Sequence, residues 1–114
     1  MKIQRFGSVI GLREEAIPEY TRIHAAVWPG VLAMIKQCNI RNYSIFLRRM
    51  PDGKPYLFSY YEYTGDDHAA DMAKMAADPT TQEWWKICEP MQQPLADRAA
   101  GDWWARGEEV FHLD

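Results

Sequence analysis

Residues 42–63 read NYSIFLRRMPDGKPYLFSYYEY, and this stretch decides the fold. Side chains from Asn42 to Leu47 alternate between two faces, as they do along a β-strand. The triplet Pro51-Asp52-Gly53 that follows is a turn signal. Residues 56–63 then form a dense aromatic and apolar run, which is typical of a further strand. The stretch therefore predicts a β-hairpin.

The residues before the hairpin predict one strand and one broken helix. Residues 2–12 mix apolar and polar side chains in the manner of a strand. From Glu14 onward, apolar and aromatic residues recur three or four positions apart, which is helical spacing. Pro29 does not fit an uninterrupted helix, because it lacks an amide donor and its ring clashes with the preceding turn. We expect a break near Trp28 and a second helix from Pro29 to about Cys38-Asn39.

The residues after the hairpin predict two more helices and a closing strand. Gly65-Asp66-Asp67 supplies a helix cap, and the residues that follow it are strong helix formers. Asp78-Pro79 ends that helix and opens another, which runs to about Met91. Residues 92–107 carry no regular pattern. The last strand is expected at Val110, Phe111 and Leu113.

The resulting order of elements is βαββαβ. This order is that of the ferredoxin-like α+β arrangement, a single antiparallel sheet with helices on one face. The uncovered face of such a sheet needs a cover, and two copies of the chain can pack together as a dimeric α+β barrel. With 114 residues, the chain has room for a single domain, residues 1–114.

Composition and charge exclude several classes of function. The formal net charge of -3 and the scattered lysines and arginines leave no basic patch for nucleic acid. The N-terminal residues lack the pattern of a signal peptide, and no apolar run is long enough to cross a bilayer. Cys38 and Cys88 lie in apolar or helical segments, so we expect buried free thiols in a reducing compartment. These features predict a cytoplasmic protein.

Tyr20 and His24 are the first candidates for chemistry. They lie four residues apart on one helical stripe, so their side chains are neighbours. A neutral imidazole beside a phenol can exchange protons near neutral pH. Spacing alone slightly favours a structural role for His24, in which its ring is half-buried and hydrogen-bonded to a tyrosine or a carbonyl group. The helix break at Pro29 favours the functional interpretation, because such departures from regular structure are enriched at functional sites.

Three aromatic residues are further candidates. Trp84 and Trp85 are adjacent on a helix and point about 100° apart, so at most one should lie squarely in a given pocket. Tyr43 heads its strand on the same face as Ile45 and Leu47. From this pattern, core packing and pocket lining are equally good interpretations of Tyr43.

No cofactor, metal or nucleophile signature is present. The three histidines form no recognised ligand cluster. His68-Ala-Ala-Asp71 is expected to be a solvated polar face of a helix rather than a metal site. Serine-elbow, phosphate-loop and dinucleotide motifs are absent as well. The functions that remain are acid–base catalysis without a cofactor and ligand binding without catalysis.

Four stretches together resemble the L-rhamnose mutarotase family. In chain order they are Tyr20-x-x-x-His24-x-x-x-Trp28-Pro29, Asn42–Leu47, Trp84-Trp85 and Glu109–Leu113. The resemblance implies a ferredoxin-like homodimer that interconverts the pyranose anomers of a 6-deoxyhexose without a cofactor or a metal. It implies His24 as the proton donor, and Tyr20, Tyr43, Trp84 and Trp85 as substrate contacts. Residues 92–107 look longer and more aromatic than the family's usual ending.

Two other functions are consistent with the same residues. A cofactor-independent monooxygenase or isomerase of the dimeric α+β barrel type also uses an aromatic pocket and a histidine. A sugar-binding module without catalysis would need the aromatic wall but not the imidazole. Oxygen uptake separates the first from a mutarotase, and binding without anomer exchange separates the second.

Overall fold

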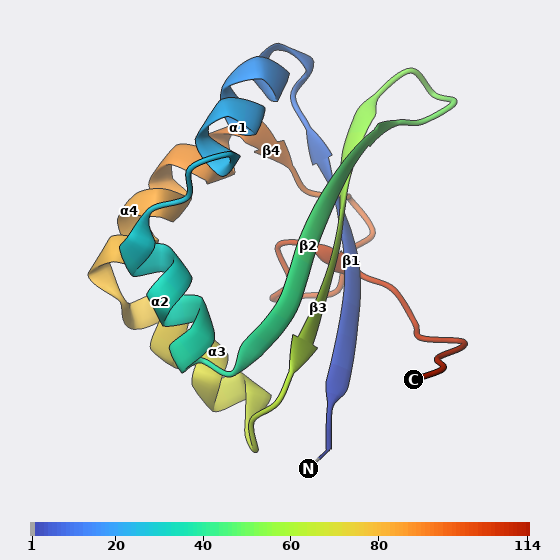
Figure 1. Ribbon diagram of the computed structural model, residues 1–114. Helices are drawn as coiled ribbons and strands as arrows, with labels where there is room; N and C mark the ends of the chain where they lie inside the picture. The colour runs from blue at the N-terminus through green and yellow to red at the C-terminus, as the bar shows by residue number, and fades with distance from the viewer. Residues whose placement is uncertain (1) are drawn as a thin grey trace.

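The computed structural model describes residues 2–114 as a curved antiparallel sheet with a layer of helices along one face (Figure 1). Two strands that form the hairpin, one strand before it and two very short ones after it make up the sheet. The elements in chain order are β1 (Gln4–Leu12), η1 (Glu14–Ala16), α1 (Ile17–His24), α2 (Pro29–Gln37), β2 (Ile40–Arg49), β3 (Pro55–Tyr63), α3 (His68–Ala77), α4 (Pro79–Cys88), η2 (Glu89–Met91), β4 (Gln92–Gln93) and β5 (Ala105–Arg106).

The sheet has the strand order β2-β3-β1-β4, and β5 also pairs with β1. The predicted hairpin is confirmed, since β2 and β3 are antiparallel neighbours with Leu47 opposite Leu57. In the next pair, Ile10 of β1 also lies opposite Leu57. The buried Ile10 and Leu57 point toward the helices, so alternate residues of each strand form the inner face of the sheet. The ferredoxin-like α+β fold is therefore confirmed.

The prediction of a last strand at Val110, Phe111 and Leu113 is wrong. These side chains are largely exposed, and no strand is assigned to residues 107–114. The single turn η2 that follows α4 instead places Gln92–Gln93 beside β1, in the position of the last strand of the ferredoxin-like order. An apolar run becomes a strand only where a neighbouring strand is free to pair with it, and β1 is already paired here with β4 and β5.

The break in the first helix lies where Pro29 predicts it. Helix α1 ends at His24 and α2 begins at Pro29, with the extended residue Trp28 as its N-cap. The two later helices are also separated as expected. The carboxylate of Asp67 accepts a hydrogen bond from the α3 backbone, and that of Asp78 does the same for α4. Each carboxylate thereby satisfies an amide that the helix itself leaves without a partner.

Two clusters of buried side chains join the helices to the inner face of the sheet. The first, which includes Tyr20, Trp84 and Cys88, packs β1 and β3 against α1, α2 and α4. The second is smaller and contains Cys38 and Met75. Both cysteines are free and buried, as predicted. The helix layer is thus attached to the sheet at two places.

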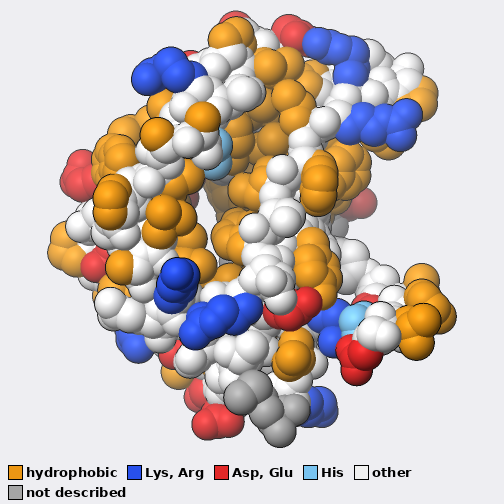
Figure 2. Space-filling view, viewed as in Figure 1, with side chains coloured by type: hydrophobic (Ala, Val, Ile, Leu, Met, Phe, Trp, Pro, Cys, Tyr) orange, Lys and Arg blue, Asp and Glu red, His pale blue; other side chains and the backbone are white. Residues whose placement is uncertain are grey.

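A hollow lies between the helix layer and the sheet, and hydrophobic side chains make up most of its visible wall (Figure 2). The curl of the sheet in Figure 1 gives the molecule the outline of a half-barrel around this hollow. Within the part of the chain that the structure describes, no helix is long and apolar enough to span a membrane.

Candidate active site

Tyr20 and His24 form a stacked pair on the last turns of α1. Their rings lie 4.0 Å apart at 19°, so the neighbourhood predicted from their spacing is confirmed. The imidazole Nδ1 is 2.8 Å from the backbone carbonyl oxygen of Tyr20. Because a carbonyl oxygen only accepts hydrogen bonds, Nδ1 carries the hydrogen. In the neutral ring, the lone pair is therefore at Nε2, which can take up or deliver a proton.

Trp84 holds the imidazole from the side. Its ring meets the His24 ring edge-on, with centroids 5.2 Å apart, and it meets Trp28 in the same way at 5.2 Å. Trp84 is almost fully buried, whereas its neighbour Trp85 is half-buried and packs against both core clusters. Of the two, Trp85 therefore has more surface for a ligand, while Trp84 restrains the ring of His24.

Burial determines the protonation state of the pair. Desolvation lowers the pKa of His24, and the hydrogen bond to the Tyr20 carbonyl offsets this only in part. Desolvation also raises the pKa of the Tyr20 phenol strongly. Near neutral pH, the site therefore combines a neutral imidazole with a phenol that keeps its proton.

Gln92 and Trp103 join this site, and neither role was predicted from the sequence. The Gln92 amide Nε2 donates to the Tyr20 hydroxyl at 3.1 Å, and the indole Nε1 of Trp103 donates to Gln92 Oε1 at 2.7 Å. These contacts link residues 72 and 11 positions apart. No periodicity or local motif relates such distant positions, so only the folded chain reveals them.

Tyr43 lies on the sheet side of the hollow, opposite the helix that carries His24. The Tyr43 ring is 42% exposed and lies 5.5 Å from the ring of Tyr61, on the inner face of the sheet. Desolvation by the surrounding protein raises the pKa of the Tyr43 phenol to about 12, so it too stays protonated. Tyr43 makes no aromatic contact or hydrogen bond with Tyr20 or His24 among the contacts of residues 2–114.

The prediction that His68 and Asp71 form a solvated polar face is wrong. The His68 Nε2 lies 2.8 Å from the Tyr61 hydroxyl, and the Asp71 carboxylate accepts hydrogen bonds from Tyr63 and Asn39. Both side chains thus point toward β3 and the end of α2 rather than into solvent. The turn before α3 brings the helix face against these tyrosines, which helical spacing alone does not reveal.

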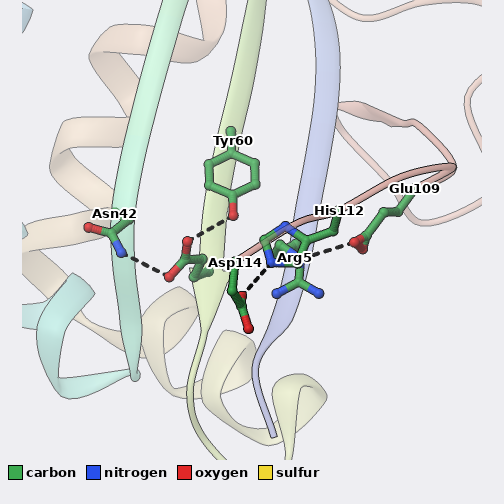
Figure 3. Close-up of polar contacts among 7 residues, drawn as sticks. Arg5, Asn42, Tyr60, Glu109, His112 and Asp114 are labelled. Carbon is green, nitrogen blue, oxygen red and sulfur yellow. Dashed lines mark hydrogen bonds and ion pairs between the residues drawn. The ribbon is translucent and has the colours of Figure 1, made fainter.

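The third histidine belongs to a separate polar cluster on the outer face of the sheet (Figure 3). There His112 pairs with Asp114, and Arg5 of β1 pairs with Glu109. These contacts hold the C-terminal residues across the outer face, away from the hollow. Across the described chain, residues 2–114, no group of three or more His, Cys, Asp or Glu side chains is arranged to hold a metal ion.

The arrangement around His24 suits proton transfer to and from a small polar molecule. It supplies one imidazole whose pKa burial lowers, so that it is neutral near pH 7, two phenols that stay protonated, and an aromatic wall. The buried Cys88 is a poor nucleophile, because desolvation raises the pKa of its thiol to about 12. The groups present therefore favour acid–base chemistry.

Comparison with known proteins identifies the class. A sequence model of the L-rhamnose mutarotase family matches residues 5–113. The chain is 32% identical to an L-rhamnose mutarotase from Lactiplantibacillus plantarum, over 96% of this chain and 98% of that protein. It is 33% identical to an L-fucose mutarotase from Xanthomonas campestris pv. campestris, over 99% of this chain and 90% of that protein.

A solved structure supports the fold independently. The crystal structure of an L-rhamnose mutarotase from Formosa agariphila superposes with a TM-score of 0.71 at 22% identity, covering 97% of this chain and 99% of that one. The protein is therefore an enzyme of the sugar mutarotase class. It belongs to the L-rhamnose mutarotase family, as the sequence motifs predicted.

Proposed function

We propose that this enzyme interconverts the α and β pyranose anomers of L-rhamnose or a similar 6-deoxyhexose such as L-fucose, with His24 as the catalytic residue. The observation that carries the proposal is the free Nε2 of an imidazole whose other nitrogen is bound to a backbone carbonyl. The names of the relatives support the class of sugar. An aromatic wall suits a sugar that carries a methyl group in place of a hydroxymethyl group.

The reaction needs only the movement of protons. The anomeric hydroxyl gives its proton to Nε2 of His24, the bond between C1 and the ring oxygen breaks, and an aldehyde forms. The ring oxygen receives a proton, and the imidazolium formed at His24 is its source. Rotation about the bond between C1 and C2, followed by the reverse steps, gives the other anomer. General acid–base help of this kind contributes about 10²–10⁴-fold.

Of the other proposed site residues, Tyr20, Tyr43 and Trp85 bind the sugar. Tyr20 and Tyr43 keep their phenolic protons and act as hydrogen-bond donors on opposite sides of the hollow. Trp85 retains exposed surface on which a sugar C–H face or methyl group can stack. Trp84 acts through His24, whose ring it restrains.

Saturation-transfer NMR tests the function directly, because it measures exchange between the two anomer signals at equilibrium. We expect the purified enzyme to accelerate exchange for L-rhamnose or L-fucose more than for D-glucose. Exchange at the uncatalysed rate for every sugar would refute the proposal. Saturable sugar binding without faster exchange would indicate a binding module, and oxygen uptake with polycyclic phenols would indicate a monooxygenase.

We also propose that the enzyme is a homodimer that forms through the outer face of its sheet. Within residues 2–114, no helix covers this face, and a row of apolar side chains crosses it from Val9 through Phe58 to Phe46, which is 65% exposed. The C-terminal residues Val110 and Phe111, beside the same face, are 87% and 81% exposed. A second copy of the chain would bury both sets of side chains.

Sedimentation tests the dimer. Phe46→Glu places a charge in the proposed interface, so we expect it to yield a monomer where the unmodified enzyme is dimeric. Leu32→Glu is the matched control, because Leu32 is 48% exposed on α2, in the helix layer. A monomeric unmodified enzyme, or equal effects of the two changes, would contradict this interface.

A cytoplasmic location completes the proposal. Two free, buried thiols fit a reducing compartment, where disulfides rarely persist. Fractionation of the source cells checks this, and recovery of the enzyme outside the cytoplasm would refute it.

A further inference from the structure

Gln92, the first residue of β4, is a buried amide with hydrogen bonds at both ends. It is 8% exposed, and its partners are the Tyr20 hydroxyl and the Trp103 indole. Backbone pairing fixes its position, because β4 lies directly against β1. A Cβ added at Gly11 would lie 2.8 Å from the carbonyl oxygen of Gln93, so the glycine permits this close approach.

The indole determines which way the amide faces. An indole N–H is a donor only, so it requires the Gln92 oxygen as its acceptor. With Oε1 bound to Trp103, the amide nitrogen must face Tyr20. That nitrogen is also a donor only, and the Tyr20 oxygen is therefore obliged to accept. The direction of both hydrogen bonds follows from the chemistry of the side chains.

The Tyr20 hydroxyl hydrogen is consequently free for another partner. It cannot go to Gln92, and among residues 2–114 the structure contains no acceptor for it. Tyr20 is 4% exposed, so its hydroxyl is a buried donor with an unused hydrogen. Its ring is stacked on that of His24, which places the donor beside the proposed catalytic group.

We propose that Gln92 and Trp103 are positioning residues that make the Tyr20 hydroxyl a hydrogen-bond donor to a sugar oxygen next to His24. The inference rests on the proposed function, and it assigns Tyr20 to the ring oxygen that gains negative charge as the bond to C1 breaks. Tyr20 donates a hydrogen bond and keeps its proton. The proton that completes ring opening comes from Nε2 of His24, so each proton is accounted for.

Trp103 connects this network to the loop after β4. The Arg98 guanidinium lies over the Trp103 ring, 5.9 Å from its centroid, and so supports the indole from the side of the loop. Trp103 itself is 39% exposed. Residues 92–107, which are more aromatic than the family's usual ending, therefore contact the active site through the indole N–H of Trp103.

Gln92→Glu tests the donor assignment with almost no change in shape. An ionised carboxylate accepts from both Trp103 and Tyr20, so the Tyr20 hydrogen is no longer available to the sugar. At pH 8 we expect kcat to fall about 100-fold, the size found when one donor to a developing oxyanion is removed. As the pH falls and the carboxyl gains a proton, its O–H can donate to Tyr20 as the amide does. The ratio of variant to unmodified kcat should then rise.

Comparison with the unmodified enzyme at each pH separates this effect from other titrations. The titratable and charged groups nearest to this network are Tyr20 and His24 on α1, Cys88 on α4, Tyr43 on β2 and Arg98 in the loop after β4. Of these, His24 carries the reaction, and burial lowers its pKa below the usual value. Because a carboxylate at position 92 would raise that pKa, the midpoint of each pH profile is measured together with the ratio of kcat values, and the ratio is compared above both midpoints. A ratio that is constant with pH, or close to one at pH 8, would overturn the proposal.

Trp103→Phe provides a second test that adds no buried charge. Without the indole N–H the amide can turn, and we expect kcat to fall about 5-fold, as the loss of one hydrogen bond allows, with little change in KM. The matched control is Trp104→Phe, since Trp104 is the adjacent indole and packs against the first core cluster. Equal effects of the two changes would overturn the proposal.

The same measurements distinguish failure of this inference from failure of the proposed function. If the unmodified enzyme exchanges no sugar anomers, the function itself is wrong. If it does so and neither variant behaves as described, Gln92 and Trp103 are structural only. Thermal melting of each variant shows whether it is folded under the assay conditions.

Discussion

The protein contains two imidazole–phenol pairs that look alike and differ in what remains free. In the α1 pair, Tyr20 stacks on His24, whose Nδ1 is bound to a carbonyl oxygen. In the α3 pair, the hydroxyl of Tyr61 is bound to His68 at Nε2. Burial lowers the pKa of both histidines. Of these two pairs, only the α1 pair leaves the histidine Nε2 without a partner among residues 2–114, so a phenol near a histidine does not by itself make a proton-transfer site.

The aromatic surroundings of the two histidines are alike, so the difference lies in the polar contacts. His68 is stacked on Phe6, with ring centroids 4.3 Å apart, and meets Tyr63 edge-on at 5.1 Å. Its one assigned polar contact is used to join α3 to β3. His24 likewise has one stacked ring, Tyr20, and one edge-on ring, Trp84, but its polar contact uses Nδ1 and leaves Nε2 for a ligand. We therefore expect the α1 pair to carry activity and the α3 pair to carry stability.

The largest expected effect is that of His24→Asn compared with His68→Asn. The first change removes the proposed proton carrier, so anomer exchange should fall about 10²–10⁴-fold. The second should leave the exchange rate largely unchanged and lower the melting temperature. Saturation-transfer NMR and thermal melting of both variants check this. A similar loss of exchange in both variants would mean that the α3 pair also takes part in catalysis.

Substitution of the two tyrosines, Tyr20 and Tyr61, should likewise affect activity in the α1 pair and stability in the α3 pair. Tyr20→Phe removes a donor to the reacting sugar, and we expect kcat to fall about 10- to 100-fold. Tyr61→Phe removes the hydrogen bond to His68, which should cost about 1 kcal/mol of stability. Steady-state kinetics and urea unfolding measure the two effects. If Tyr61→Phe reduced kcat as strongly as Tyr20→Phe, the division between the pairs would be wrong.

The pH dependence of exchange should follow the α1 pair alone. Neutral His24 is the proton acceptor, so the rate should fall as the pH drops through its pKa, which lies below the usual 6.5 or so. The His68→Asn variant should show the same midpoint. A midpoint at or above the ordinary value for histidine, or one that moves in His68→Asn, would contradict the assignment.

The stability of the fold should also decline as the pH falls. The unfolded chain binds protons at both histidines near pH 6.5, whereas the folded chain binds them only at lower pH. The unfolded state therefore binds more protons in between, so these two groups make folding less favourable as the pH falls below about 6.5. Urea unfolding at several pH values, with His68→Asn as the comparison, separates the two contributions.

The smallest expected effects come from the helix caps beside each pair. Asp78 accepts from both the amide and the hydroxyl of the buried Thr81, in the helix that carries Trp84. Asp67 accepts from the amide of Ala70, in the helix that carries His68. Each substitution by Ala should cost about 1 kcal/mol. Asp78→Ala should cost more, because it also leaves the Thr81 hydroxyl without a partner, and thermal melting compares the two.

Most of the fold could be predicted because its signals are local. The turn at Pro51-Asp52-Gly53 and the helix break at Pro29 each depend on a few adjacent residues. The position of the last strand is not local. Gln92 and Gln93 carry no strand pattern and are paired because β1 presents a free edge there. The apolar residues near Val110 have the pattern but no partner.

The site divides in the same way. The contact between Tyr20 and His24 follows from four-residue spacing on one helix, so the sequence predicted it. Helix geometry also anticipated that Trp84 and Trp85 would differ in their surroundings. Gln92 and Trp103 could not be found, because their contacts depend on how β4 and the loop after it return to α1.

The two free cysteines allow local opening of the protein to be measured without introducing a cysteine by mutation. Cys88 belongs to the core cluster beneath the α1 pair and Cys38 to the smaller cluster near the α3 pair. Desolvation raises the pKa of both thiols, so neither should react with an alkylating reagent until its cluster opens. The order in which the two thiols are alkylated in native buffer therefore shows which of the two core clusters opens first, and so which end of the helix layer separates first from the sheet.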